Sequence, residues 1–159
     1  MATTINLDTS QRVDVVCRKG DTFDLALTLK DTAATPASIV TKADSFKMEV
    51  RTSDDSNAAY ANGNATIVLS TEDSDGSGDT KQINVKDSQG FNLPYADPQT
   101  PSSDVITDGI VRFSVSSTIM ALTSAGLYVY DIEMTDESDS SKVTTLIYGT
   151  FKINEDVSV

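Results

Sequence analysis

The chain has 159 residues, of which 38% are hydrophobic and 6% aromatic, so it has the length and the apolar content of about one domain with a core. Twelve Lys and Arg residues stand against 24 Asp and Glu residues, and the net charge is −12. Nucleic acids and anionic membranes are bound through clustered cations, and this composition has the opposite sign. We therefore expect neither nucleic acid nor a membrane as a partner.

The chemistry-bearing residue types are sparse. The chain has no histidine, which removes the commonest general base and the commonest zinc ligand, and with them any Ser-His-Asp or Cys-His arrangement. Its one cysteine, Cys17, follows apolar residues and is interpreted as a small buried hydrophobe. No GxxxxGK[ST] or GxGxxG phosphate loop is present. The sequence predicts a protein that is not an enzyme and needs no cofactor.

The domain organisation is simple. Residues 1–11 are Thr-rich and are expected to form an N-terminal arm or an edge strand, and residues 12–159 a single domain without internal repeats. No apolar run approaches the roughly 18 residues that span a bilayer. The first ten residues lack the charged-then-apolar form of a signal peptide. We expect the protein to be made in a cytoplasm.

Strand patterns dominate the first half of the chain. In 23–30 the residues Phe23, Leu25, Leu27 and Leu29 alternate with polar or small ones, and this period of two indicates a half-buried strand. Gly20 lies in a turn just before it. Similar but shorter patterns predict further strands at 12–18, 46–51 and 66–70, and a brief extended piece at 39–40.

The second half begins with a strand at 82–86 and a proline-containing loop at 87–109 that is long for a compact domain. A strand at 110–116 follows, with Val111, Phe113 and Val115 predicted to point inward. The segment 117–125 is the one plausible helical turn, which Ser117 or Thr118 would cap and Gly126 would end.

A β-hairpin from Gly126 to Ile153 is the strongest prediction. Alternation places Tyr128, Tyr130, Ile132 and Met134 on one face of its first arm. The second arm, from Val143 onward, is rich in β-branched and aromatic residues, and the polar loop 136–141 joins the two. Seven or eight short strands with one helical turn indicate an all-β fold, an antiparallel β-sandwich, with a small closed barrel as the alternative.

One acidic loop resembles a calcium loop. The string 73–79 places Asp73, Asp75, Ser77 and Asp79 close together in a pattern related to D-x-[DN]-x-[DN]-G. Asn84 stands where the closing bidentate Glu belongs, and no helix pattern flanks the loop. We therefore favour a solvated acidic turn and predict no metal, with these four residues as the weak alternative.

Aromatic residues suggest two kinds of role. Tyr128, Tyr130 and Tyr148 could form a sugar-binding stripe, but their place in the hairpin favours packing. Loop residues are better candidates for contact with a partner protein, because a buried aromatic anchor supplies much of the energy of an interface. The predicted partner-contact residues are Tyr60, Phe91, Leu93 and Tyr95.

Five motifs occur in a characteristic order: RKGDTFDL, FKMEVR, VRFSVS, LxxxGxYxYDI and GxFxI, which begin at residues 18, 46, 111, 122 and 149. In this order they resemble the immunoglobulin-like β-sandwich modules of tailed-phage virions, notably the N-terminal domain of baseplate upper proteins. The similarity covers residues 12–157. It implies an immunoglobulin-like sandwich without catalytic residues.

The resemblance also implies a role and a location. We expect a structural protein of a tailed-phage virion, in the tail, baseplate or neck or anchoring a fibre, that contacts other virion proteins and forms a homo-oligomer or a symmetric array. Two alternatives remain: a capsid decoration protein, and a module that binds a glycan or a cell-surface protein through its loops.

Overall fold

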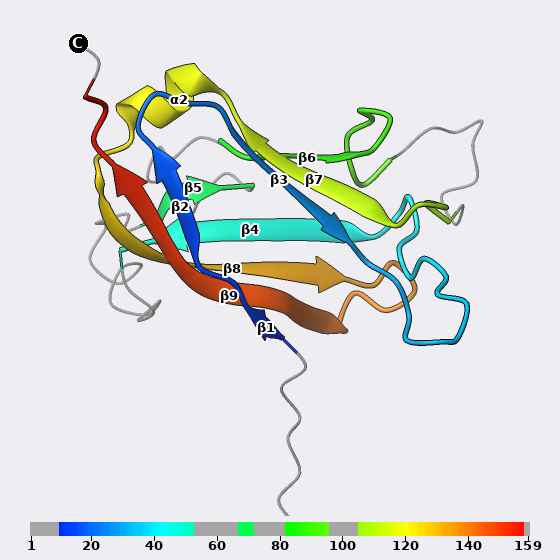
Figure 1. Cartoon of the computed structure of the whole chain (residues 1–159). Helices are drawn as coiled ribbons and strands as arrows, with labels where there is room; N and C mark the ends of the chain where they lie inside the picture. Colours follow the sequence, from blue (N-terminus) through cyan, green and yellow to red (C-terminus); the bar gives the residue numbers. More distant parts are fainter. Residues whose placement is uncertain (1–9, 53–66, 72–81, 96–104, 158–159) are drawn as a thin grey trace, which may run out of the picture.

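The computed structural model describes residues 10–52, 67–71, 82–95 and 105–157, and these contain nine strands and one short helix (Figure 1). The protein is all-β, as predicted. In chain order the elements are β1 (Gln11–Arg12), β2 (Val15–Arg18), β3 (Phe23–Thr28), β4 (Ser45–Arg51), β5 (Ile67–Ser70), β6 (Asn84–Asp87), β7 (Ile110–Val115), α2 (Ser117–Leu122), β8 (Gly126–Thr135) and β9 (Val143–Asn154).

The strands form two sheets. The larger has the order β1-β9-β8-β4-β5, with β2 also paired to β9, and the smaller has the order β3-β7-β6. Pairing is antiparallel except that β1 and β2 run parallel to β9. The predicted antiparallel arrangement is therefore wrong for the first two strands. No tight turn links them to β9, so their direction is not imposed by a hairpin.

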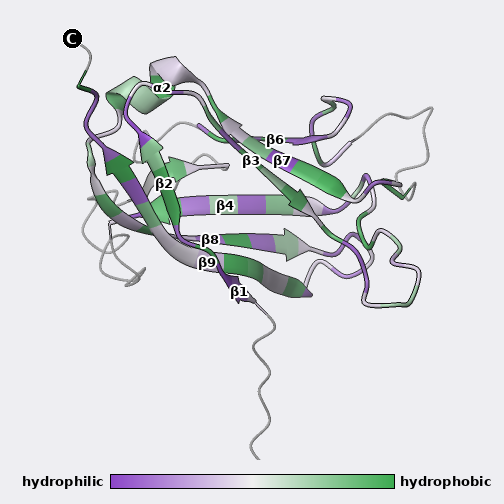
Figure 2. Cartoon of the chain, viewed as in Figure 1, coloured by the Kyte–Doolittle hydropathy of each residue, from purple (hydrophilic) through white to green (hydrophobic). Residues whose placement is uncertain are grey.

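One hydrophobic core joins the two sheets. Phe23 of β3 meets Phe151 of β9 edge-to-face at a ring distance of 5.2 Å, and Phe46 of β4 meets Phe113 of β7 at 6.3 Å. Val111, Phe113 and Val115 are buried as predicted. Figure 2 shows hydrophobic and hydrophilic residues alternating along β4, which is the pattern of a sheet that is wet on one side.

The predicted hairpin is confirmed. β8 and β9 pair from Gly126 with Ile153 to Thr135 with Val143, and the register shifts once, between Ile132 and Glu133. Tyr128, Tyr130 and Ile132 are buried. This hairpin contributes the two central strands on which the larger sheet is built.

The strand predicted at 12–18 is interrupted at Val13 and Asp14. The Val13 N–H donates to the Tyr148 carbonyl at 2.9 Å, while the Val13 carbonyl accepts from the Tyr130 hydroxyl at 2.7 Å. The Asp14 carboxylate accepts the Thr150 N–H at 3.0 Å. The Asp14 side chain thus replaces a backbone carbonyl as the acceptor of one hydrogen bond between the strands, and the chain bends there between β1 and β2.

Three element ends differ from prediction. The helix is capped by Ser116, whose hydroxyl accepts the Ile119 N–H at 3.4 Å, and it ends at Leu122 with Thr123 as its C-cap; Gly126 instead begins β8. β6 begins two residues later than predicted, because the Gln82 N–H is already bonded to the Ser70 carbonyl. β3 ends at Thr28 rather than at residue 30.

Several predicted segments lie outside the described residues. They include 1–9 of the expected arm, the loop at 53–64, most of the acidic loop at 71–80, and 96–104 of the long loop. The described remainder of 1–11 includes Gln11, which pairs with β9 at the edge of the larger sheet. In the part of the chain that the structure describes, no helix is long and apolar enough to cross a membrane.

Candidate interaction surfaces

The weak metal candidates Asp73, Asp75, Ser77 and Asp79 all lie outside the described residues. Within the described ranges, no group of three or more Cys, Asp or Glu side chains is placed to hold a metal ion.

The predicted partner-contact residues separate into two environments. Tyr60 lies outside the described residues, and the other three follow β6. Leu93 is only 8% exposed and belongs to the core, whereas Phe91 is 49% exposed. Tyr95 is partly buried. The structure therefore places Leu93 as an anchor of this segment, and Phe91 and Tyr95 at the surface.

A turn after β6 fixes the position of Phe91. The buried Asp87 carboxylate accepts the N–H groups of Gln89 and Phe91, each at 2.9 Å, and the Asp87 N–H donates to the Phe91 carbonyl at 3.0 Å. Two residues later the Leu93 N–H donates to the Val85 carbonyl at 3.0 Å. Asp is suited to this position because its short carboxylate reaches N–H groups of the following residues.

Phe91 and Tyr95 form a small aromatic patch. Their rings meet edge-to-face at 5.4 Å with an interplanar angle of 62°. The Lys42 ammonium lies 5.9 Å from the centre of the Tyr95 ring, and the Tyr95 N–H donates to the Lys42 carbonyl at 2.7 Å. An aromatic pair held in this way loses little conformational freedom when a partner covers it.

A polar hollow of about 310 Å³ adjoins this region, and it is lined by Lys42, Asp87, Ser88, Gln89 and residues 105–108. The Ser88 hydroxyl donates to the Asp108 carboxylate, and this bond, with a further one from the Ile110 N–H at 3.0 Å, lowers the pKa of Asp108. Asp108 is thus held ionised as a turn-forming acceptor. A carboxylate in this state is not suited to act as a general acid.

The second candidate surface is the outward side of the larger sheet, and we call it the outer face. Residues that stand opposite one another in adjacent strands point to the same side, so the register defines its members. They include Arg12, Val16, Arg18, Lys47, Glu49, Arg51, Leu127, Val129, Asp131, Glu133, Tyr148, Thr150 and Lys152. Asp14 joins them through its bond to the Thr150 N–H.

A shallow hollow of about 380 Å³ lies in the outer face. Val129 and Thr150, which are opposite one another in β8 and β9, lie between the longer side chains of Arg12, Arg51 and Tyr148 in its lining. Because Val129 and Thr150 have short side chains, the surface is lower above them than above the arginines and Tyr148. The result is a depression with an apolar component and two guanidinium groups.

The charges at this hollow are paired. The Glu49 carboxylate is only 5% exposed and lies between the Arg51 guanidinium and the Lys47 ammonium, which is 3.0 Å away. Arg12 pairs with Asp14 at 3.3 Å. A carboxylate buried this far needs such partners, because losing its hydration costs several kcal/mol.

The tyrosines of the hairpin are mostly structural. Tyr128 and Tyr130 are buried, as the packing interpretation predicted, while Tyr148 is 41% exposed on the outer face. Burial raises the pKa of Tyr130 to about 12. Cys17 packs partly against the core, and burial raises the pKa of its thiol to about 11, so it stays protonated at neutral pH and is not a nucleophile there.

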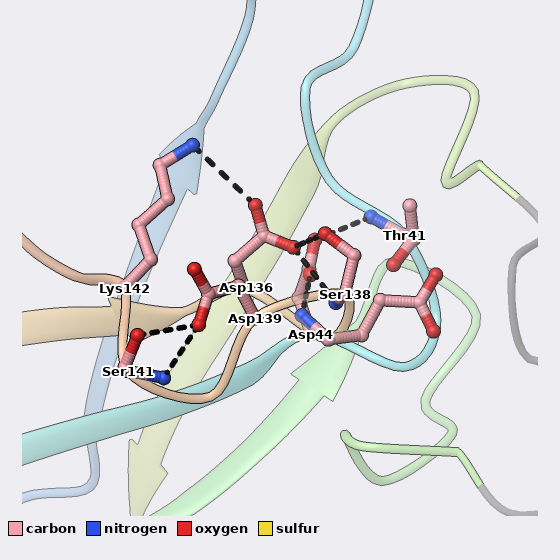
Figure 3. Close-up of polar contacts among 8 residues, drawn as sticks. Thr41, Asp44, Asp136, Ser138, Asp139, Ser141 and Lys142 are labelled. Atoms are coloured by element: carbon pink, nitrogen blue, oxygen red, sulfur yellow. Dashed lines mark hydrogen bonds and ion pairs between the residues drawn. The ribbon is translucent and has the colours of Figure 1, made fainter.

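The polar loop of the hairpin, residues 136–141, is held by hydrogen bonds and by an ion pair between the Asp136 carboxylate and the Lys142 ammonium at 3.5 Å (Figure 3). Asp136 accepts the Ser138 hydroxyl at 2.6 Å and Asp139 accepts the Ser141 hydroxyl, and these bonds lower the pKa of both carboxyl groups. Asp44 bridges two segments by accepting the Thr41 N–H at 2.8 Å and the Glu137 N–H at 3.1 Å.

The outer face was not predicted as a site, although the sequence carried a signal. Leu127 and Val129 have the same parity as Asp131 and Glu133, which is the outward parity of β8. Two aliphatic residues on the wet side of an amphipathic strand are a departure from simple alternation.

Comparisons with known proteins show no family. No protein-family model matches the chain, and no curated protein matches it. Among solved structures, one match is a family 123 glycoside hydrolase from Clostridium perfringens, at 12% identity and a TM-score of 0.39. The match covers 98% of this chain, which spans 24% of that structure.

Proposed function

We propose that the chain is an immunoglobulin-like β-sandwich module. That fold has seven strands in two sheets, one with the strand order 3-6-7 and the other with the order 2-5-4. In this chain we count β1 and β2 as one interrupted first strand and β5 as an additional strand. On this count β4, β8 and β9 correspond to strands 3, 6 and 7, and β3, β7 and β6 correspond to strands 2, 5 and 4.

A hydrogen bond at the crossing between the sheets also supports this fold. The Tyr128 hydroxyl, near the start of β8, donates to the Ser124 carbonyl at 2.7 Å. A tyrosine at this position that bonds back to the backbone a few residues upstream is a hallmark of immunoglobulin-like domains. The chain has no tryptophan and a single cysteine, so the buried phenylalanines occupy the core in place of a disulfide and an indole.

The function we propose is that of a non-enzymatic structural protein of a tailed-phage virion, in the tail, baseplate or neck or as a fibre anchor. The ordered motifs from RKGDTFDL to GxFxI support this assignment. The observation that carries a role in protein contact is the aromatic patch, where Phe91 is 49% exposed yet fixed by the Asp87 turn and by the ring of Tyr95. The partner of the patch is another virion protein.

The test uses particles produced from the genome that encodes the chain. Mass spectrometry of purified particles should find the protein at a constant ratio to the major structural proteins. Phe91→Ala should lower that ratio at least about tenfold, equivalent to about 1.4 kcal/mol of binding. Leu122→Ala, which trims a side chain that is 79% exposed on α2, is the matched control and should leave the ratio unchanged.

Absence of the protein from particles would contradict the assignment. Binding of the purified protein to a glycan array, lost in Phe91→Ala, would instead favour the glycan-binding module. Incorporation that is equal in wild type and Phe91→Ala would remove the aromatic patch from the contact.

A further inference from the structure

We propose that the outer face is the surface through which a second copy of this chain binds. The contact rests on the proposed function, in which copies of one module assemble, and it adds the side of the module on which two copies meet. Apolar exposure, charge and shape each support it.

The outer face carries a row of exposed apolar side chains. Val16 of β2 and Leu127 of β8 both stand opposite Lys152 of β9, so the three lie in one line across the sheet. Val16 is 65% exposed and Leu127 66% exposed. The two aliphatic residues are about 10 Å apart, two strand spacings, and Lys152 occupies the position between them. Two strongly exposed aliphatic residues in one row differ from a singly exposed side chain, which needs no explanation.

The charge of the outer face differs from that of the chain as a whole. The face carries five cations, Arg12, Arg18, Lys47, Arg51 and Lys152, and four anions, Asp14, Glu49, Asp131 and Glu133, so its net charge is +1. The chain has 12 cations and 24 acids; removal of these five cations and four acids leaves 7 and 20, so the rest of the chain carries a net charge of −13.

This distribution favours a second copy as the occupant. Two copies repel each other when strongly acidic surfaces meet, because like charges at an interface are unfavourable. The outer face has no excess of acidic charge to oppose contact, and the cations and anions of one copy can pair with those of the other.

The hollow supplies the complementary shape. Val129 and Thr150 form its small-residue part, and Tyr148, which also lines it, is 41% exposed. Two copies that meet face to face present both a projecting side chain and a recess to one another. Self-complementarity of this kind is required of a two-fold interface.

Native mass spectrometry and sedimentation velocity of the purified full chain, at about 100 μM, test the proposal. The wild type should form a defined oligomer of two or more copies. Leu127→Asp should weaken association at least about tenfold. Lys152→Glu should do the same, because it replaces an exposed cation with an exposed anion and so adds repulsion between the two faces. Thermal unfolding of both variants checks that they fold. If Leu127→Asp does not fold, Lys152→Glu still tests the interface.

Lys30→Glu is the matched control. It brings the chain to the same net charge of −14 as Lys152→Glu but lies after β3, outside the outer face. It should associate like the wild type. A wild type that is monomeric at this concentration, an oligomer that persists in both outer-face variants, or equal weakening by Lys30→Glu and Lys152→Glu would overturn the proposal. None of these outcomes depends on whether the protein is found in virions.

Discussion

Gly149 of β9 lies directly against the carbonyl group of Val13, at the bend between β1 and β2. A Cβ atom at position 149 would be 2.2 Å from the Val13 oxygen and 2.9 Å from its carbon. The close approach lets the Val13 carbonyl accept the Tyr130 hydroxyl at 2.7 Å, and it brings the Asp14 carboxylate to the Thr150 N–H. The interruption of the first strand and the glycine 136 residues later are therefore one structural feature.

Gly149→Ala should destabilise the protein by about 2 to 3 kcal/mol, because backbone atoms rather than a flexible side chain would have to move. Chemical denaturation measures this loss, and a fall in Tm of roughly 4 to 12 °C should accompany it. Gly126→Ala is the control: the atoms nearest to its Cβ would be those of the Tyr128 side chain, at an ordinary contact distance of 3.6 Å, and stability should change little. Equal stability of the two variants would contradict the steric account.

The parts of the fold that were predicted are those set by neighbouring residues. Alternation within Phe23–Thr28 and Ile110–Val115 identified both strands and their buried sides, and the polar loop between two β-rich arms identified the hairpin. The break at Val13 was not predicted, since its cause lies in Gly149. No local pattern reports a contact between residues so far apart in the chain.

The hydrogen bond from Tyr128 to the Ser124 carbonyl should contribute about 1 kcal/mol to stability. Tyr128→Phe removes only the hydroxyl and leaves the Ser124 carbonyl without that donor, so the free energy of unfolding should fall by about this amount. Tyr148→Phe makes the same change at an exposed position and should be nearly neutral. If both variants unfold at the same denaturant concentration as the wild type, the hydrogen bond from Tyr128 to Ser124 makes no net contribution to stability.

The candidate surfaces were predicted only in part, for a similar reason. Phe91, Leu93 and Tyr95 alternate in the same way along the sequence, and all three were predicted as partner-contact residues. In the structure Leu93 packs in the core while Phe91 is half exposed. The turn that Asp87 closes decides which side chain faces outward. For the outer face, the opposition of Val16, Lys152 and Leu127 depends on a parallel pairing that no hairpin signal predicts.

Acid should destabilise the protein through the carboxylates that cap backbone N–H groups. The pKa of Asp14 lies below its ordinary value of 3.8, chiefly because the folded-state carboxylate accepts the Thr150 N–H, and the pKa values of Asp108, Asp136 and Asp139 are lowered too. The folded state binds these protons less readily than the unfolded state. The stabilisation is therefore complete above pH 3.8 and is lost as the pH falls through the folded-state pKa values.

Denaturation at a series of pH values from about 5 to about 2 measures this loss. Asp14→Asn removes one titrating group, so its free energy of unfolding should fall less steeply with acidification than that of the wild type. A slope identical to the wild type would show that the bond to Thr150 does not distinguish the folded from the unfolded state.

Asp44→Ala should destabilise the protein by about 2 to 4 kcal/mol, because two N–H groups, those of Thr41 and Glu137, lose their acceptor at once (Figure 3). Asp44 is only 4% exposed, so water does not readily replace its carboxylate. Asp44→Asn keeps one carbonyl acceptor and should lose about half as much. Hydrogen exchange separates a local from a global effect. In Asp44→Ala the Glu137 amide should lose protection, whereas the protection of the β7 amides should fall only as much as the global free energy of unfolding falls. Unchanged protection of Glu137 would mean that the loop is held in place without Asp44.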